Sequence, residues 1–305
     1  MKKKSLLCIL LMMTLLLFTG CTKEEENNDM SLHIVTSFYP MYVATSNIVD
    51  GISNVDLVCL ASPSVGCLHD YQLTVNDMMT LEKADVFVIN GGGMESFLDK
   101  AVSAYPKLSI INASDGIIEM HEEEHEEKHE GGEHHHEENS HIWVSISMYI
   151  EEVENIAQKL GEYDLKNAEK YQKNAEEYIQ RLEKLKEDMH NQLDSVTHKD
   201  IVTFHEAFDF FAEEFGLHIK AVIEREPGTY PSAREVAEII KLIQSKEVNA
   251  IFTEPQYAKT AATTIAKETG VSVFELDPVV TGELEKDAYE KAMRKNLAVL
   301  KEALQ

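Results

Sequence analysis

The chain has 305 residues and a formal net charge of −26, from 54 acidic and 28 basic residues. Phosphate contacts need clustered lysine and arginine, so this balance excludes a nucleic-acid-binding protein. An acidic surface instead raises the local concentration of cations. The length suits two domains, or one large domain, with ample core.

The N-terminal segment predicts an export signal. Three lysines, Lys2 to Lys4, precede an apolar run from Leu6 to Phe18 that is interrupted only by Thr14. A charged start followed by a short apolar stretch is typical of secretory signals. The run is too short for a stable membrane span, which needs about 20 apolar residues.

This segment ends in FTGC at residues 18–21, which resembles a bacterial lipoprotein cleavage site, although that pattern prefers leucine where Phe18 stands. We predict a signal peptide over residues 1–20, a lipid on Cys21 and a flexible tether over residues 21–30. The protein is then anchored outside the bacterial cell membrane and does not span it. An ordinary secretory signal with a chance cysteine is the alternative.

Short, almost continuously apolar runs recur in two sets and predict strands. The first set is 32–38, 54–61, 84–91 and 107–114, and the second is 201–205, 219–224, 248–254 and 271–277. Such runs are typical of strands buried on both faces of a parallel sheet. Helical patterns, clearest at 232–247 and 258–270, separate the strands. The predicted fold class is α/β with two lobes, each a mostly parallel four-stranded sheet flanked by helices.

Two cysteines of the mature chain, Cys59 and Cys67, lie eight positions apart in the first lobe. A disulfide is permitted outside the cell. The sequence leaves three states open: a short-loop disulfide, two free thiols, or an accessory thiolate ligand at Cys67.

Residues 121–138 hold six histidines and nine glutamates, and no residue that can join a hydrophobic core. This composition predicts a disordered loop over residues 119–139. The segment matches HExxH twice, but a protease needs a packed helix to hold both imidazoles on one face. We expect weak zinc binding or, alternatively, a merely solvating loop. The histidines of this accessory loop are His121, His125, His129, His134, His135 and His136.

His141 differs because it lies where apolar residues resume, in HIWVSI, so packing can hold it. His69 follows the second predicted strand, His205 ends the fifth and Asp277 ends the eighth. Ligands bind at the carboxyl ends of strands in open α/β sheets. These four residues, two from each lobe, therefore predict a metal site in the cleft between the lobes.

Residues 161–197 predict one long helix that bridges the lobes. Its apolar residues are spaced by three or four positions and share one helical face. They are Tyr171, Ala175, Tyr178, Leu182, Leu185, Met189 and Leu193. We accordingly place an N-terminal lobe at 31–160 and a C-terminal lobe at 198–305.

Six motifs, CLHDYQL, HIW, FHEAF, PSAREVAEII, IFTEPQ and ELDP, occur in this order between about residues 31 and 303. As an ordered set they resemble the zinc-specific solute-binding lipoproteins of bacterial metal ABC importers, the cluster A-I family. The resemblance implies two α/β lobes bridged by a rigid long helix, one tight Zn²⁺ site between them, a permease as partner, and no enzymatic activity.

The same resemblance matches the three histidine ligands of that family to His69, His141 and His205, and its carboxylate to Asp277. An acidic histidine-rich loop is also a mark of its zinc branch. Two departures are Cys67-Leu68, where the family usually carries proline before the histidine, and a longer EPGTYPSA at 226–233.

Three imidazoles and at most one carboxylate suit Zn²⁺ in a tetrahedral site, whereas Mn²⁺ prefers more oxygen. We expect Asp70, Glu206 and Glu254 to be candidates for orienting the imidazoles. The predicted function is extracytoplasmic zinc capture by a monomeric component of an importer. The alternatives are a manganese- or iron-specific member of that family, a zinc hydrolase, or a zinc-dependent surface adhesin.

Overall fold

The computed structural model describes residues 31–117, 139–223, 232–245, 248, 250–256 and 260–305. The chain divides into two compact units, Met1–Ser31 and Leu32–Gln305, and the fold is that of the second unit. The predicted signal peptide, the lipid site at Cys21 and the six histidines of the accessory loop lie outside the described residues. Within the described ranges, no helix combines the length and the apolar character that crossing a membrane requires.

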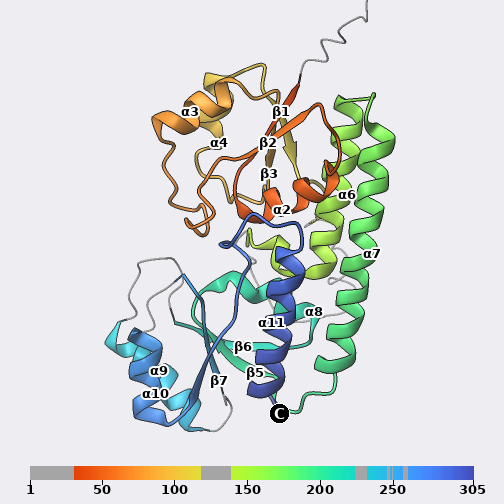
Figure 1. Ribbon diagram of the computed structural model, residues 1–305. Helices are drawn as coiled ribbons and strands as arrows, with labels where there is room; N and C mark the ends of the chain where they lie inside the picture. Colours follow the sequence, from red (N-terminus) through yellow and green to blue (C-terminus); the bar gives the residue numbers. More distant parts are fainter. Residues whose placement is uncertain (1–30, 118–138, 224–231, 246–247, 249, 257–259) are drawn as a thin grey trace, which may run out of the picture. The chain divides into compact units, whose positions relative to one another are not determined.

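Two four-stranded sheets form the frame of the second unit (Figure 1). The first sheet contains β1 (Leu32–Thr36), β2 (Val55–Cys59), β3 (Val86–Ile89) and β4 (Ser109–Asn112). The second contains β5 (Asp200–Thr203), β6 (His218–Val222), β7 (Ala250–Thr253) and β8 (Ser272–Glu275). Every strand pair is parallel. The α/β fold class with two parallel four-stranded sheets, predicted from the apolar runs, is confirmed.

The two sheets share one topology. Their strand orders are β2-β1-β3-β4 and β6-β5-β7-β8. In each sheet the second strand in sequence pairs with one side of the first strand, and the third strand pairs with its other side. The direction of strand addition therefore reverses between β1 and β3, and between β5 and β7. Ligands of open α/β sheets bind at the carboxyl ends of strands beside this reversal. Residues that follow β5 and β7 are therefore well placed for a binding site.

The helices connect and cover these strands. The first lobe contains α2 (Tyr39–Ile48), α3 (Val75–Glu82), α4 (Leu98–Ala104), the 3₁₀ turn η2 (Ile142–Val144) and α6 (Ile146–Tyr163). After α7 (Ala168–Leu193) come the 3₁₀ turn η3 (Glu206–Phe208), α8 (Asp209–Glu214), α9 (Ala233–Gln244), α10 (Thr260–Thr269) and α11 (Ala288–Ala303). One large apolar core includes residues from both sheets, and a smaller core lies under α9 and α10.

Helix α7 lies within the range predicted for the linking helix, but α6 ends inside that range at Tyr163. The two helices lie side by side (Figure 1) and are joined by a turn at 164–167. Asp164 stabilises the turn, because its Oδ2 accepts hydrogen bonds from Asn167 Nδ2 (2.7 Å) and from the hydroxyl of Tyr171 (2.9 Å). The helical linker is thus the second half of an antiparallel pair.

The apolar face predicted for this helix is fully buried, with 0% exposure for all seven of its residues. Helix α7 packs against α6, against α2 in the first lobe and against α11 near the C-terminus. The linking helix therefore contributes side chains to a core that it shares with both sheets.

Glu152 in α6 is a buried carboxyl within this core region. It is fully buried, and among the described residues neither of its side-chain oxygens has a hydrogen-bond partner. Burial raises its pKa well above the ordinary value of 4.5, and the charges of Glu95 and Glu151 raise it further. The free energy of unfolding that depends on a neutral Glu152 is therefore fully present below the unfolded-state pKa. It is lost as the pH rises through the folded-state pKa.

A Glu152→Gln variant is expected to remove this loss, because glutamine does not titrate. The difference in free energy of unfolding between the variant and the wild type should grow in favour of the variant as the pH rises above the unfolded-state pKa. The growth is up to about 1.4 kcal/mol per pH unit. Urea unfolding at several values between about pH 5 and about pH 8 measures the difference. Glu187→Gln, on the exposed face of α7, is the control. Parallel stability curves for the wild type and Glu152→Gln would contradict the prediction.

Candidate metal centre

His141 lies directly before η2 and is buried, with 2% exposure. Its ring lies 5.3 Å from the ring of Trp143, between centroids. Asn139 fixes the ring, because its Oδ1 lies 3.0 Å from the backbone nitrogen of His141 and 2.8 Å from Nδ1. The amide nitrogen of Asn139 donates to the Glu206 carbonyl oxygen and to Asp209, so Oδ1 faces the imidazole as an acceptor. This arrangement places the proton on Nδ1 and leaves the Nε2 lone pair for a cation.

His205 follows β5 by two residues and is also 2% exposed. Its Nδ1 lies 3.5 Å from Oε1 of Glu254, which is the first residue after β7 and is fully buried. Gln256 Nε2 donates to the other carboxylate oxygen of Glu254 at 2.7 Å. The carboxyl ends of β5 and β7 thus place the His205 imidazole beside the Glu254 carboxylate, which faces its Nδ1.

The structure brings His69, His141 and His205 together from three separate segments. The Nε2 atoms of His69 and His141 lie 3.3 Å apart. Ring centroids lie 5.1 Å apart for His69 and His141, 4.8 Å for His141 and His205, and 6.3 Å for His69 and His205. Within the described residues, His141 and His205 belong to a group whose ligand atoms lie within 4.8 Å of one another, whereas His69 is outside that group and contacts His141.

Glu214 ties the segment of His141 to the helix that follows His205. This residue ends α8, and its carboxylate accepts hydrogen bonds from the backbone nitrogens of Ile146 (2.8 Å) and Ser147 (3.1 Å). A carboxylate at a helix N-terminus satisfies backbone donors that have no partner within the helix. The start of α6, immediately after η2, is therefore fixed to α8.

Cys67 joins the histidine cluster. Its Sγ lies 3.5 Å from Nε2 of His141. Ligand atoms of Cys67, His141 and His205 all lie within 4.8 Å of one another. Cys59 and Cys67 are both free thiols, so the disulfide considered from the sequence is not formed. Cys59 Sγ instead donates to the carbonyl oxygen of Ala61 at 3.2 Å.

Asp277 follows β8 by two residues, but its contacts are with neighbouring backbone. Its Oδ1 accepts from the backbone nitrogen of Val279 at 2.8 Å. Asn296 holds its backbone, accepting from its nitrogen (2.8 Å) and donating to its carbonyl oxygen (2.7 Å). The charge of Asp277 contributes to raising the pKa of Glu254, so the two carboxyl groups interact. Among the described residues, Asp277 is not in the group whose ligand atoms lie within 4.8 Å.

Burial sets the electrostatics of the site. It lowers the pKa of His141 well below its usual value, with smaller contributions from His205 and His69. Burial also raises the pKa of Glu254, which His205 and Gln256 partly offset. The pKa of the Cys67 thiol is raised well above its usual value by burial and by the charge of Glu254. The neutral form of the His141 imidazole is the form that binds a metal cation.

Of the three residues considered as partners for the imidazoles, Glu254 faces His205, whereas Asp70 is exposed. Glu206 contributes its backbone oxygen, as an acceptor for Asn139. Sequence reasoning missed Asn139, which lies at the end of a stretch predicted to be disordered, and Gln256. The spacing of Asn139, two residues before His141, was the available signal.

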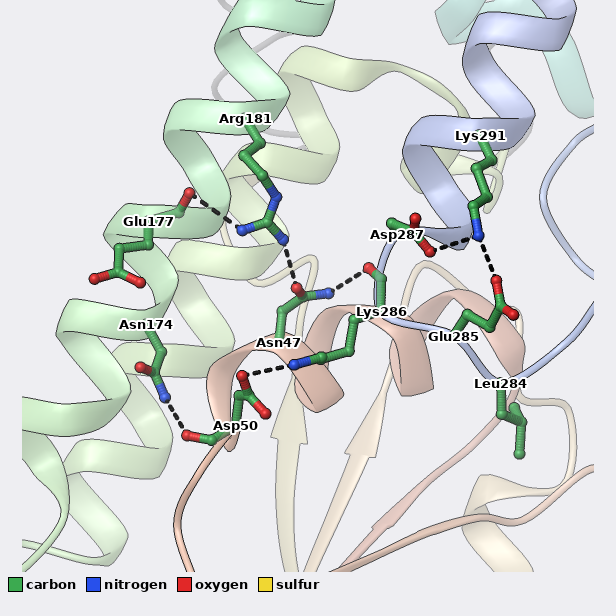
Figure 2. A pocket seen from close by; sticks show the side chains of 10 residues that line it. All are labelled: Asn47, Asp50, Asn174, Glu177, Arg181, Leu284, Glu285, Lys286, Asp287 and Lys291. Atoms are coloured by element: carbon green, nitrogen blue, oxygen red, sulfur yellow. Dashed lines mark hydrogen bonds and ion pairs between the residues drawn. The ribbon is translucent and has the colours of Figure 1, made fainter.

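One cavity, of about 650 Å³, is lined mostly by polar and charged residues from the end of α2, from α7 and from the segment that leads into α11. Figure 2 shows Arg181 of α7 donating to Asn47 of α2, which in turn donates to the backbone of Lys286. Lys286 also pairs with Asp50. The residues lining this cavity include no histidine or cysteine. We interpret it as a polar junction that holds α7 to α2 and to the segment that leads into α11.

The chain is similar to known proteins of zinc uptake. The model of the family described as "Zinc-uptake complex component A periplasmic" matches residues 34–303. The chain is 34% identical to the high-affinity zinc uptake system protein ZnuA of Bacillus subtilis, over 90% of this chain and 88% of that protein. It is 32% identical to the zinc-binding lipoprotein AdcA of Streptococcus pneumoniae over 99% of this chain, although it spans only 61% of AdcA.

A solved structure adds a further comparison. The Zn(II)-bound variant of AdcAII from Streptococcus pneumoniae superposes with a TM-score of 0.76 at 28% identity, covering 90% of this chain and 99% of that chain. The family consists of solute-binding components of transporters and not of enzymes, which argues against the zinc hydrolase alternative. The chain belongs to the zinc-uptake complex component A family, the family that its motifs resemble.

Proposed function

We propose that this protein captures Zn²⁺ outside the cytoplasm and delivers it to the permease of an ABC importer. The convergence of His69, His141 and His205 carries the proposal, since the Nε2 atoms of the first two lie only 3.3 Å apart. Two of the three imidazoles are almost completely buried and have a polar partner at Nδ1. Such partners fix the tautomer and the orientation of metal-binding histidines.

Zinc is the favoured cargo on chemical grounds. The site presents imidazole nitrogens, which suit Zn²⁺ in tetrahedral geometry, whereas Mn²⁺ prefers sites richer in oxygen. The names of the relatives from Bacillus subtilis and Streptococcus pneumoniae also specify zinc. Asp277 remains the fourth ligand expected from the resemblance.

The same relatives support a location outside the cytoplasm. The family description specifies a periplasmic component, and AdcA is a lipoprotein. We propose that Cys21 carries the lipid, that the protein is a monomer, and that the permease binds it outside the membrane. The loop that contains His121–His136 would collect zinc weakly and pass it to the buried site, because neutral imidazoles on a solvated loop bind metal loosely.

Deleting residues 121–138 tests both parts of the proposal in vitro. The soluble chain, residues 22–305, is expected to bind one Zn²⁺ tightly and further ions weakly. The deleted form should keep the tight ion and lose the weak ones, because the loop supplies none of the three converging imidazoles. Metal analysis and competition titration against a chromogenic chelator measure both classes of site. Loss of the tight site with the loop would contradict the proposal.

The proposed role in zinc import is tested in cells that produce the same two forms of the protein with their signal peptide. Cells without the protein should need more zinc for growth in chelated medium, and both forms should restore growth. If the gene deletion leaves growth and zinc uptake unchanged, a surface adhesin without an importer becomes the better account.

A further inference from the structure

The thiol of Cys67 lies beside the imidazoles of the proposed metal site. In the described part of the chain, Cys67, His141 and His205 are the group of metal-binding side chains whose ligand atoms lie within 4.8 Å of one another. Cys67 Sγ lies 3.5 Å from the same Nε2 of His141 that His69 Nε2 approaches at 3.3 Å. One imidazole nitrogen is thus shared between a sulfur and a nitrogen neighbour.

These two separations match the edges of a tetrahedral zinc site. Zn–N bonds of about 2.0–2.1 Å and Zn–S bonds of about 2.3 Å imply an N···N edge of about 3.3–3.4 Å and an N···S edge of about 3.6 Å. The observed values are 3.3 Å and 3.5 Å. Among the described residues, His69 is outside the group whose ligand atoms lie within 4.8 Å, so its imidazole would have to move towards a cation held by Cys67, His141 and His205.

The backbone around Cys67 holds the thiol in this position. Gly66 has a φ of 90°, a conformation that residues with a Cβ rarely adopt, and it turns the chain immediately before Cys67. Leu68 is fully buried, and its backbone nitrogen donates to the sulfur of Met94 at 3.4 Å. A Cβ on Gly66 would lie 3.9 Å from Gln256, which donates to the Glu254 carboxylate beside His205. The loop of Cys67 therefore lies beside the segment after β7 that carries Glu254 and Gln256.

We propose that Cys67 binds the captured metal as a thiolate, together with His69, His141 and His205, and that it takes the place expected for Asp277. The proposal rests on the proposed function of zinc capture. On binding, the S–H bond is replaced by a sulfur–metal bond, and the proton is released to the solvent. Asp277 would then act at a distance, since among the described residues it is outside the group whose ligand atoms lie within 4.8 Å.

A thiolate changes which cations the site prefers. Soft sulfur ligands favour Zn²⁺ and other thiophilic ions over Mn²⁺, which binds oxygen-rich sites. Cys67 is thus a specificity-determining residue that excludes manganese more strongly than three imidazoles and a carboxylate would.

Zinc X-ray absorption of the purified full chain with one equivalent of Zn²⁺ tests the proposal directly. We expect a sulfur neighbour at about 2.3 Å from zinc in the wild type. The signal should persist in Cys59→Ser and disappear in Cys67→Ser. Cys59 is the matched control, because it ends β2 and its thiol donates to the carbonyl oxygen of Ala61, away from the histidine cluster. Competition titration should show a loss of zinc affinity of more than about 100-fold in Cys67→Ser, since a ligand is removed, with a smaller change for Mn²⁺.

The possible failures separate the two proposals. Tight zinc with only nitrogen and oxygen neighbours in the wild type would overturn the role of Cys67 and leave zinc capture intact. A sulfur signal that survives in Cys67→Ser would also overturn that role. Absence of tight zinc binding from the wild-type chain would overturn zinc capture itself.

Discussion

A His141→Ala variant is expected to lose the tight zinc site. The Nε2 atom of His141 is the point at which the donor atoms of His69 and Cys67 meet, at 3.3 Å and 3.5 Å. Removing a partner that only orients a ligand typically lowers metal affinity 10–100-fold, so removing this ligand should lower it by more than about 100-fold. Competition titration of the full chain against a chelator of known affinity measures the loss, and His205→Ala should give a loss of similar size.

Two surface histidines provide matched controls. His33 lies in the first lobe and pairs with Asp56, and its side chain is 47% exposed. His218 lies in the second sheet and pairs with Asp200, with 63% exposure. His33→Ala and His218→Ala should bind zinc as the wild type does. Unchanged zinc affinity in His141→Ala, with the metal-free protein folded by circular dichroism, would show that the tight site lies elsewhere.

The strands and the buried face of α7 were predictable because their signals are local. Six strands lie within nearly continuous apolar runs, and β5 and β6 begin one residue before theirs. Parallel strands buried on both faces require such runs. Strand β3 (Val86–Ile89), for example, is buried at every residue. Spacings of three and four likewise predicted which side chains of α7 would be buried, and all of them are.

The break between α6 and α7 was not predictable from those signals. The turn at 164–167 contains neither glycine nor proline, and its only turn-forming residue types are Asp164 and Asn167. It is stabilised by the side chain of Asp164, which accepts from Asn167 and Tyr171. A polar side chain that bonds within its own turn competes with the helix, and such competition is visible only in three dimensions.

The site was predictable as a set of strand ends, but the directions of its side chains were not. His205 and Asp277 each follow a strand of the second sheet by two residues. His205 faces the cluster, whereas Asp277 bonds the backbone two residues further along. Position at a strand end specifies the edge of the sheet and leaves the rotamer and the neighbouring turn undetermined. For the same reason, the sequence did not predict that the Cys67 thiol lies close to His141.

A Trp143→Ala variant is expected to give the largest loss of stability among single changes near the site. Trp143 is fully buried, and its ring meets that of Phe38 edge to face at 5.0 Å. Its Nε1 donates to the carbonyl oxygen of Pro278 at 2.7 Å. Truncating a buried tryptophan to alanine costs about 3–5 kcal/mol, from lost burial and the cavity left behind. Urea unfolding of the metal-free protein measures the cost.

The same variant tests whether packing positions His141. The Trp143 ring lies 5.3 Å from the His141 ring, so its removal frees one side of the imidazole, while Asn139 still holds Nδ1. Zinc affinity should therefore fall by about 10-fold, less than in His141→Ala. Trp143→Phe keeps the aromatic body and loses the bond to Pro278, so it should cost about 1 kcal/mol and keep most of the zinc affinity. If Trp143→Ala is destabilised but binds zinc as tightly as the wild type, the Asn139 bond alone suffices to orient His141. Such a result would assign Trp143 to the core and not to the metal site.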